Sequence, residues 1–195
     1  VVENKPGGNY LVGYNAFKAA KGDPHTLFVA DIGFVAIQPH IPAPEVVEPR
    51  TAFKPVTDLF YTSFVMLARP DRFGSLAELL KAAQDKPGGL NYGASGSASG
   101  QRLSVELLKA QTGRNLTFIP YAGNAPALTA LLAGDVDLVS IGLPPAKPFL
   151  DAGRLKALAV TSTERSSVLP QVPTVDEAAG LKGYAADSWV GVFGP

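Results

Sequence analysis

The chain has 195 residues, of which 46% are hydrophobic and 17% charged, a composition that indicates a packed core and excludes a disordered chain. Its 17 Lys and Arg balance 17 Asp and Glu, and no dense basic run is present, so we expect no nucleic-acid partner. Cys is absent, which excludes disulfides, thiolate metal ligands and a Cys nucleophile. Composition alone leaves the cellular compartment open.

No stretch approaches the roughly 20 consecutive apolar residues that span a bilayer, so stable membrane insertion is not expected. The sequence begins with VVENKPGG, without Met or a basic leader, and this stretch is typical of a strand end that enters a turn. We therefore expect that residues upstream of Val1, including a signal peptide, are missing from this chain.

Two buried strands are expected early in the chain, at residues 26–31 (TLFVAD) and 59–68 (LFYTSFVMLA). Both are short runs of β-branched and aromatic residues, the composition that favours strands. Between them, residues 41–50 (IPAPEVVEPR) contain too many prolines for a helix or a central strand, which predicts a surface loop.

Helices and strands alternate from Ser75 onward. Glu78 follows Ser75 at capping-box spacing and predicts a helix start, and Thr174 with Glu177 repeats the signal. The other expected elements, in order, are a strand at 90–94, a helix at 101–113, a strand at 116–121, a helix capped by Asn124 and ended by Gly134, a strand at 136–142, a helix at 145–153 and a strand at 155–162.

This alternation predicts the α/β class, with βα units in a mainly parallel, doubly wound sheet. In such sheets ligands bind at the carboxyl ends of strands, where a strand gives way to a helix N-terminus. Residues 90–103, LNYGASGSASGQRL, lie at one of these positions. They form the first candidate site.

Catalytic and cofactor motifs do not fit this segment. Its windows GASGS and GSASG miss the G-x-S-x-G spacing of a nucleophile elbow, and neither dinucleotide nor P-loop spacing occurs. The two histidines, His25 and His40, lie in Pro-flanked turn sequence and are interpreted as exposed turn residues. Asp135 and Asp137 have no His nearby and are interpreted as flanking a strand start. We expect no catalytic residue, cofactor or metal.

The segment suits an anion better. The first N–H groups of a helix lack intrahelical acceptors, and the aligned peptide dipoles favour negative charge there. Ser95, Ser97 and Ser99 add hydroxyl donors, although any one of them could simply cap the helix. Arg102 opposes the helix dipole at a cost of a few tenths to about 1 kcal/mol, which a bound anion would offset. Alternatively, Arg102 is solvated and points away from the loop.

Five segments together resemble, in order and spacing, one known family, the substrate-binding proteins of tripartite tricarboxylate transporters (Bug or TctC-like). The run A-V-T-S…R…L-P-x-V-P-T at residues 159–174 is the most specific part. The five segments are VVENKPGG, LNYGASGSASGQRLSVELLK, IPYAGNAPALTALLAGDVDL, LKALAVTSTERSSVLPQVPTVDEAAG and SWVGVFGP.

The resemblance implies a type II periplasmic-binding-protein-like fold, with two doubly wound lobes joined by crossing strands. Residues 1–69 with 188–195 would form an incomplete lobe I and residues 70–187 lobe II, with hinge crossings near 66–70 and 187–190. It also implies a periplasmic, monomeric, non-enzymatic protein that closes on a small organic carboxylate and delivers it to a membrane permease. An α/β hydrolase-like enzyme and a carboxylate sensor that signals to a membrane partner remain alternatives.

In this family two loops hold the ligand carboxylate. One should precede Val1, and the other corresponds to Ala94 to Gln101. The resemblance and the departures from it give the expected ligand-binding residues, which are Ala94, Ser95, Gly96, Ser97, Ser99, Gln101, Arg102, Asp31 and Phe34.

The departures from the family pattern bear on the ligand. Arg102 stands where the family often has His, and Ile141-Gly142 stands where an Asp-Asn pair is common. Asp31 brings a new charge to a region that is usually small and polar, and Phe34 is either an aromatic wall of the site or ordinary core. These differences predict a monocarboxylate with an apolar or aromatic body rather than a citrate-like tricarboxylate.

Overall fold

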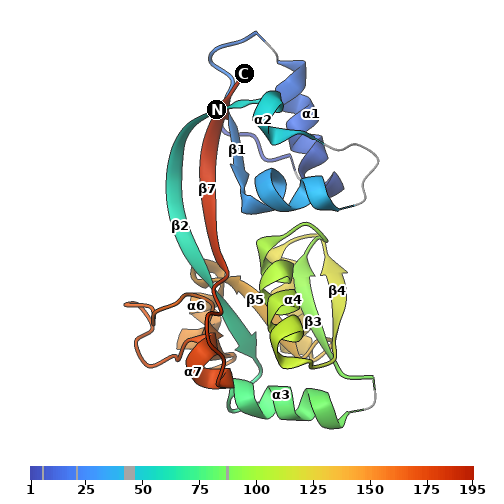
Figure 1. Ribbon diagram of the computed structural model, residues 1–195, viewed down its shortest axis with the longest axis vertical. Helices are drawn as coiled ribbons and strands as arrows, with labels where there is room; N and C mark the ends of the chain where they lie inside the picture. Colours follow the sequence, from blue (N-terminus) through green and yellow to red (C-terminus); the bar gives the residue numbers. More distant parts are fainter. Residues whose placement is uncertain (6, 21, 42–46, 87) are drawn as a thin grey trace. The chain divides into compact units, whose positions relative to one another are not determined.

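The computed structural model describes residues 1–195 apart from 6, 21, 42–46 and 87, and divides the chain into two units (Figure 1). Unit 1 comprises Val1–Thr62, Ala98–Gly100 and Ser188–Pro195, and unit 2 comprises Ser63–Ser97 and Gln101–Asp187. Half of the loop expected at 41–50, residues 42–46, lies outside the described residues, and its last two residues begin the short helix α2 (Pro49–Ala52) instead. The division into two binding lobes remains a proposal.

Unit 1 is built around a short antiparallel pair. Strand β1 (Phe28–Asp31) pairs with β7 (Asp187–Gly194), and β7 lies between β1 and β2 (Lys54–Ala68) in the strand order. The helical elements are η1 (Gly8–Tyr10), α1 (Leu11–Ala19), η2 (Gly33–Ile37, a turn of π-helix), η3 (Gln38–His40) and α2 (Pro49–Ala52).

The strand end expected at VVENKPGG is wrong, because the described residues from Val1 to Gly7 carry no regular structure. Gly7 has a φ of 114°, a conformation outside the β region. The polar residues between Val2 and Gly7 also leave no apolar face for a sheet to bury.

Aromatic side chains form the core of unit 1. Phe34 is 0% exposed, and its ring centroid lies 5.4 Å from that of Phe28, 5.5 Å from Tyr14 and 5.9 Å from Phe53. Phe53 also contacts Phe193 of β7, at 4.6 Å. Such tilted and edge-on pairs each add about 0.5–1.5 kcal/mol beyond the burial of area.

Unit 2 contains a mixed sheet. β3 (Leu90–Ser95) runs parallel to β4 (Leu116–Tyr121) and β5 (Leu138–Gly142). The last part of β2 is antiparallel to both β5 and β6 (Lys156–Val160). The described strands β3, β4, β5 and β6 therefore run in one direction, which confirms the expectation of a mainly parallel sheet. β2 is the exception, because it carries the chain in from unit 1 and runs opposite to β3.

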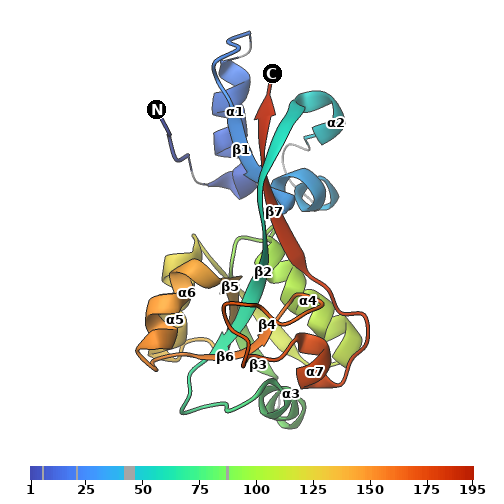
Figure 2. The same cartoon turned by 90° about the vertical axis from the view of Figure 1, so that its left-hand side faces the viewer.

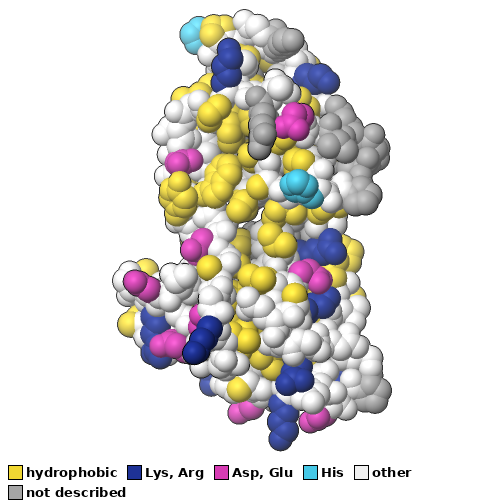
Figure 3. Space-filling model, viewed as in Figure 1, with side chains coloured by type: hydrophobic (Ala, Val, Ile, Leu, Met, Phe, Trp, Pro, Cys, Tyr) yellow, Lys and Arg dark blue, Asp and Glu magenta, His cyan; other side chains and the backbone are white. Residues whose placement is uncertain are grey.

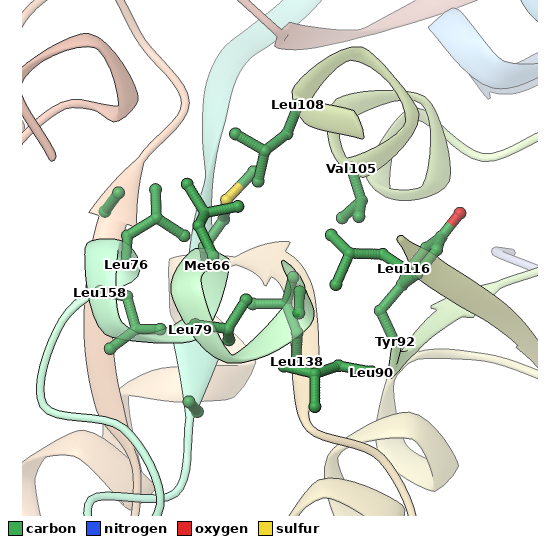
Figure 4. Close-up of a cluster of buried hydrophobic side chains, with 14 of the residues drawn as sticks. Met66, Leu76, Leu79, Leu90, Tyr92, Val105, Leu108, Leu116, Leu138 and Leu158 are labelled. Carbon is green, nitrogen blue, oxygen red and sulfur yellow. The ribbon is translucent and has the colours of Figure 1, made fainter. Parts of the chain in front are cut away.

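Helices cover both faces of this sheet (Figure 2). One face carries α5 (Asn124–Ala133) and α6 (Leu143–Asp151), which pack with Val65 and Leu67 of β2. The other carries α3 (Leu76–Asp85), α4 (Gly100–Thr112) and α7 (Val175–Ala179), which pack with Met66 and Ala68. Successive β2 residues thus point to opposite faces of the sheet and enter two separate, mainly aliphatic clusters. Figure 4 shows the cluster that contains Met66.

Local capping signals set most helix starts in unit 2. The Ser75 side chain accepts the Glu78 N–H, and Thr174 with Glu177 forms a complete capping box, as the sequence predicted. Asn124 is not a cap but the first residue of α5, because Gly123 occupies the cap position and the Asn124 amide has another partner, Gln101.

One residue ties together the two places where the chain enters and leaves unit 2. The Thr161 Oγ1 accepts the Phe64 N–H at 2.8 Å and donates to the Ala186 carbonyl at 3.0 Å. The Thr161 backbone also bonds to both, donating to the Phe64 carbonyl and accepting from the Ala186 N–H, each at 3.0 Å. Phe64 and Ala186 lie next to the boundary residues Ser63 and Asp187.

Within the described part of the chain, no helix is long and apolar enough to cross a membrane.

Candidate functional site

The candidate loop lies between β3 and α4. β3 ends at Ser95 and α4 begins at Gly100, close to the boundaries expected from the sequence. Gly96 turns the chain with a φ of 71°, and its N–H donates to the Tyr121 carbonyl at 3.2 Å. Ala94 and Ser99 are buried, whereas Ser95, Gly96 and Ser97 are partly exposed. The loop therefore offers backbone and hydroxyl donors at the carboxyl end of a parallel strand.

The residues expected to bind the ligand are divided between the two units. Ala94, Ser95, Gly96 and Ser97 belong to unit 2, as do Gln101 and Arg102. Ser99, Asp31 and Phe34 belong to unit 1.

A second helix N-terminus lies beside the first. Gln101 Nε2 donates to Asn124 Oδ1 at 3.4 Å and so joins the start of α4 to the start of α5. The carboxyl ends of the parallel strands β3 and β4 precede these two helices, at the same edge of the sheet. Both positive dipole ends therefore lie close together, which favours an anion more than either helix does alone.

Buried hydroxyl groups fix the first turn of α4. Ser104 Oγ donates to the Gln101 carbonyl at 2.7 Å and lies 2.7 Å from Ser140 Oγ on β5. The Tyr184 hydroxyl donates to the Ser104 carbonyl at 2.7 Å. Burial raises the pKa of Tyr184, so this hydroxyl keeps its proton at neutral pH. No sequence pattern predicted this network, since its members are distant in sequence and resemble ordinary core or surface residues.

Arg102 does not point away from the loop, so the second alternative drawn from the sequence is wrong. Its Nη1 donates to the Ser97 carbonyl at 2.9 Å, and its guanidinium lies 4.7 Å from the centroid of the Phe118 ring. The positive charge thus stays beside the loop while it supports the loop's backbone. A cation over an aromatic face gains about 0.5–2 kcal/mol, which offsets the unfavourable position in the first turn of a helix.

Tyr92, Glu106 and Lys109 form a charged network next to Arg102. The Tyr92 hydroxyl donates to Glu106 Oε1 at 2.5 Å, and Lys109 Nζ donates to Glu106 Oε2 at 2.9 Å. Burial raises the pKa of Glu106, but the bonds from Lys109 and Tyr92 and the charge of Arg102 outweigh it and leave this pKa below its ordinary value. Glu106 is therefore ionised at neutral pH and offsets one of the two positive charges of Arg102 and Lys109.

In unit 1 the Asp31 carboxylate accepts hydrogen bonds from neighbouring residues of the same unit. Oδ1 accepts the Gly33 N–H at 2.9 Å and the Phe34 N–H at 3.4 Å, and Oδ2 accepts the Tyr10 hydroxyl at 3.3 Å. Burial raises the pKa of Asp31, although these bonds act in the opposite direction. A Cβ on Gly33 would overlap the Tyr10 hydroxyl oxygen, so this packing requires glycine.

Phe34 lies in the aromatic core of unit 1, in agreement with the packing alternative drawn from the sequence. His25 and His40 are exposed in the same unit, as expected, and His25 lies in a turn, whereas His40 is the last residue of η3. Asp137 accepts the Asn91 N–H at 3.0 Å and so holds a strand start. Among the described residues, no group of three or more His, Cys, Asp or Glu side chains could hold a metal ion.

The fold is that of the periplasmic binding proteins. Over 100% of this chain and 65% of each solved chain, it matches R. palustris Rpa4515 with adipate at a TM-score of 0.90 and 33% identity, and the periplasmic binding protein BugD at 0.90 and 31%. The α/β, type II binding-protein-like class expected from the sequence is confirmed.

The chain belongs to the TctC family, the tripartite tricarboxylate transporter family receptors, whose model matches residues 1–195. It is 33% identical over 195 residues to a UPF0065 protein encoded in the tcbD-tcbE intergenic region of Pseudomonas sp. strain P51. That alignment covers 100% of this chain and 58% of the relative, so the chain spans little more than half the relative's length. The family resemblance inferred from the sequence is confirmed.

Proposed function

We propose that the protein is a periplasmic receptor that binds a small organic carboxylate without converting it. The observation that carries this proposal is the pair of helix N-termini, α4 and α5, joined by the bond from Gln101 to Asn124 beside a loop of serines. A carboxylate placed there would accept N–H and hydroxyl donors, and hydrogen bonds to a charged group are about twice as strong as neutral ones. The similar structure of Rpa4515 is one with adipate, a carboxylate, and this supports the ligand class.

The proposed ligand is a monocarboxylate with an apolar or aromatic body. Ile141 is 0% exposed in an aliphatic cluster and supplies no polar anchor for a second carboxylate. Asp31 would repel an additional carboxylate placed near it, because its hydrogen-bond donors are uncharged and leave its negative charge in place. Calorimetric titration with benzoate, adipate and citrate tests this ranking, and tightest binding of citrate would overturn it.

The site itself is tested by Ser95→Ala and Gln101→Ala, two partly exposed residues of the loop. Each change removes a donor or the link to α5, so we expect carboxylate affinity to fall about tenfold, as the loss of a charge-assisted bond predicts. Ser167→Ala, an exposed serine elsewhere in unit 2, is the matched control. Unchanged affinity in both loop variants would remove this loop from the site.

The proposed partner is the membrane permease of a tripartite tricarboxylate-type transporter. In a strain that lacks the gene, uptake of the labelled ligand should be restored by the complete protein and not by its Gln101→Ala variant. If the strain that lacks the gene takes up the ligand normally but loses a cellular response to the ligand, the protein is a sensor instead. Mass spectrometry of the ligand after prolonged incubation should recover it unchanged, and conversion would favour an enzyme.

A further inference from the structure

Unit 2 contains a groove that shares no residue with the carboxylate loop. Its volume is about 580 Å³, which falls in the range of roughly 300–1,000 Å³ typical of small-molecule sites. It is lined by the start of α3, by β6 and by the segment from Arg165 to Ala178, which includes part of the run that is most specific to the family. Figure 2 shows that segment in orange and red between β6 and α7.

The apolar part of the lining comes from both clusters of unit 2. Leu76 and Leu158 belong to the cluster around α3 and α4, whereas Leu169 and Val172 belong to the cluster around α5 and α6. All four side chains are at most 9% exposed, so they are held in place by packing. The groove therefore presents a preformed hydrocarbon surface where the two clusters meet.

Two charged residues of the lining, Arg165 and Glu177, form an ion pair with each other. Arg165 Nε donates to Glu177 Oε2 at 2.8 Å, and the same oxygen accepts the Thr174 N–H at 2.8 Å. Arg165 Nη1 also donates to the Pro170 carbonyl at 3.3 Å. This ion pair fixes the segment that forms one wall, and its two charges cancel.

Lys156 is different, because it is exposed and makes no ion pair or hydrogen bond through its ammonium group with any residue that the structure describes. Ser75 adds a second donor. Its oxygen accepts the Glu78 N–H at 3.2 Å, which leaves the hydroxyl proton available. With the Arg165–Glu177 pair neutral, the groove carries one net positive charge from Lys156.

We propose that this groove is a second binding site, for a medium-chain amphipathic carboxylate whose carboxylate group meets Lys156 and whose hydrocarbon chain covers Leu158, Leu169 and Val172. The ligand's charge complements Lys156, and its hydrocarbon chain matches the apolar side chains of the lining. The site does not depend on the proposed function of the loop at Ser95–Gln101.

Octanoate is the probe, with octanol as the uncharged control and acetate as the control without a chain. In amide NMR spectra of the labelled protein, we expect octanoate to shift the signals of Leu155, Leu169 and Val172 in a saturable way. Octanol and acetate should shift them only weakly. No shift at these amides at millimolar octanoate would overturn the proposal, and so would equal shifts with octanol.

Lys156→Gln removes the charge from an exposed position and should weaken octanoate binding about fivefold, in keeping with one exposed charge pair. Lys182→Gln, an exposed lysine outside the groove, is the matched control and should bind like the unmodified protein. Equal affinity in the Lys156 and Lys182 variants would exclude Lys156 as the anchor. Shifts confined to residues 94–102 would place octanoate in the loop site and also overturn the proposal.

Discussion

Units 1 and 2 bury their sheets in different ways. In unit 2 helices cover both faces, and the last five residues of β2, Phe64 to Ala68, are all buried. In unit 1 the same strand is exposed along its first part, where Val56 is 59%, Phe60 53% and Tyr61 70% exposed. Figure 3 shows hydrophobic side chains at the surface of unit 1 over β2 and β7.

The two units therefore depend on different kinds of packing. The described residues of unit 2 form two mainly aliphatic clusters, one on each face of the sheet, so a defect in one leaves the other face covered. Among the described residues of unit 1, the core is one cluster, built mainly of aromatic rings around Phe34. We expect unit 1 to be the less stable of the two and to respond more strongly to one change.

The largest effect is expected from Phe34→Ala. Truncating a fully buried Phe costs about 3–5 kcal/mol of unfolding free energy, through lost transfer energy and the cavity left behind. Trp189, the one Trp of the chain, lies in unit 1 with its ring 6.4 Å from Phe193, so its fluorescence in urea reports this loss. A Phe34→Leu variant should lose less, and an unchanged midpoint for Phe34→Ala would contradict the single-cluster description.

The corresponding change in unit 2 is Leu131→Ala, which removes a fully buried side chain of α5. We expect a loss of about 2–4 kcal/mol. Hydrogen exchange of the β3 and β5 amides should accelerate, while the Trp189 transition moves less than it does in Phe34→Ala. If both variants change Trp189 fluorescence and the hydrogen exchange of β3 and β5 equally, the two units unfold together and do not differ in stability.

A smaller effect is expected from the helix caps of unit 2. Ser75→Ala and Thr174→Ala each remove a side-chain acceptor from a helix start and should cost about 1 kcal/mol. Ser167→Ala, exposed and outside any helix, serves as the control. Urea melts followed by circular dichroism measure these differences, and a control as damaging as the caps would show that the caps are not the cause.

The smallest effect concerns pH and unit 1. Because the pKa of Asp31 is raised in the folded chain, the folded state holds this proton more tightly than the unfolded state, whose Asp pKa is about 3.9. The associated stabilisation is present below pH 3.9 and is lost as pH rises through the folded pKa. Asp31→Asn should flatten this part of the pH profile of the Trp189 urea midpoint. Parallel profiles for the two proteins would contradict the assignment.

Local signals made much of unit 2 predictable. Ser75 and Thr174 cap helices through bonds that span three residues, so the sequence contains the whole interaction. The role of Asn124 could not be predicted in this way, because its side chain accepts a hydrogen bond from Gln101, 23 positions away, instead of capping the helix. The direction of β2 was missed for a similar reason, since strand pairing is settled by distant partners.

The position of the candidate loop between a strand and a helix could be predicted from the sequence, but its contacts could not. The strand-to-helix change between Ser95 and Gly100 follows from composition and spacing. That Arg102 would bind the Ser97 carbonyl and lie on Phe118 could not be inferred, because Phe118 comes from the neighbouring strand. The hydroxyl network of Ser104, Ser140 and Tyr184 could not be predicted either, because its members are distant in sequence and meet only in the folded chain.

The bonds of Thr161 have a consequence for how the chain could be rearranged. They hold Phe64 and Ala186 to the same residue, so nearly all of unit 2 is an insertion whose two ends are fastened side by side. Insertions with adjacent ends can be exchanged between related hosts with little effect on the strands that carry them. A chimera between two members of this family could therefore be joined next to Phe64 and Ala186, the two positions that Thr161 holds together.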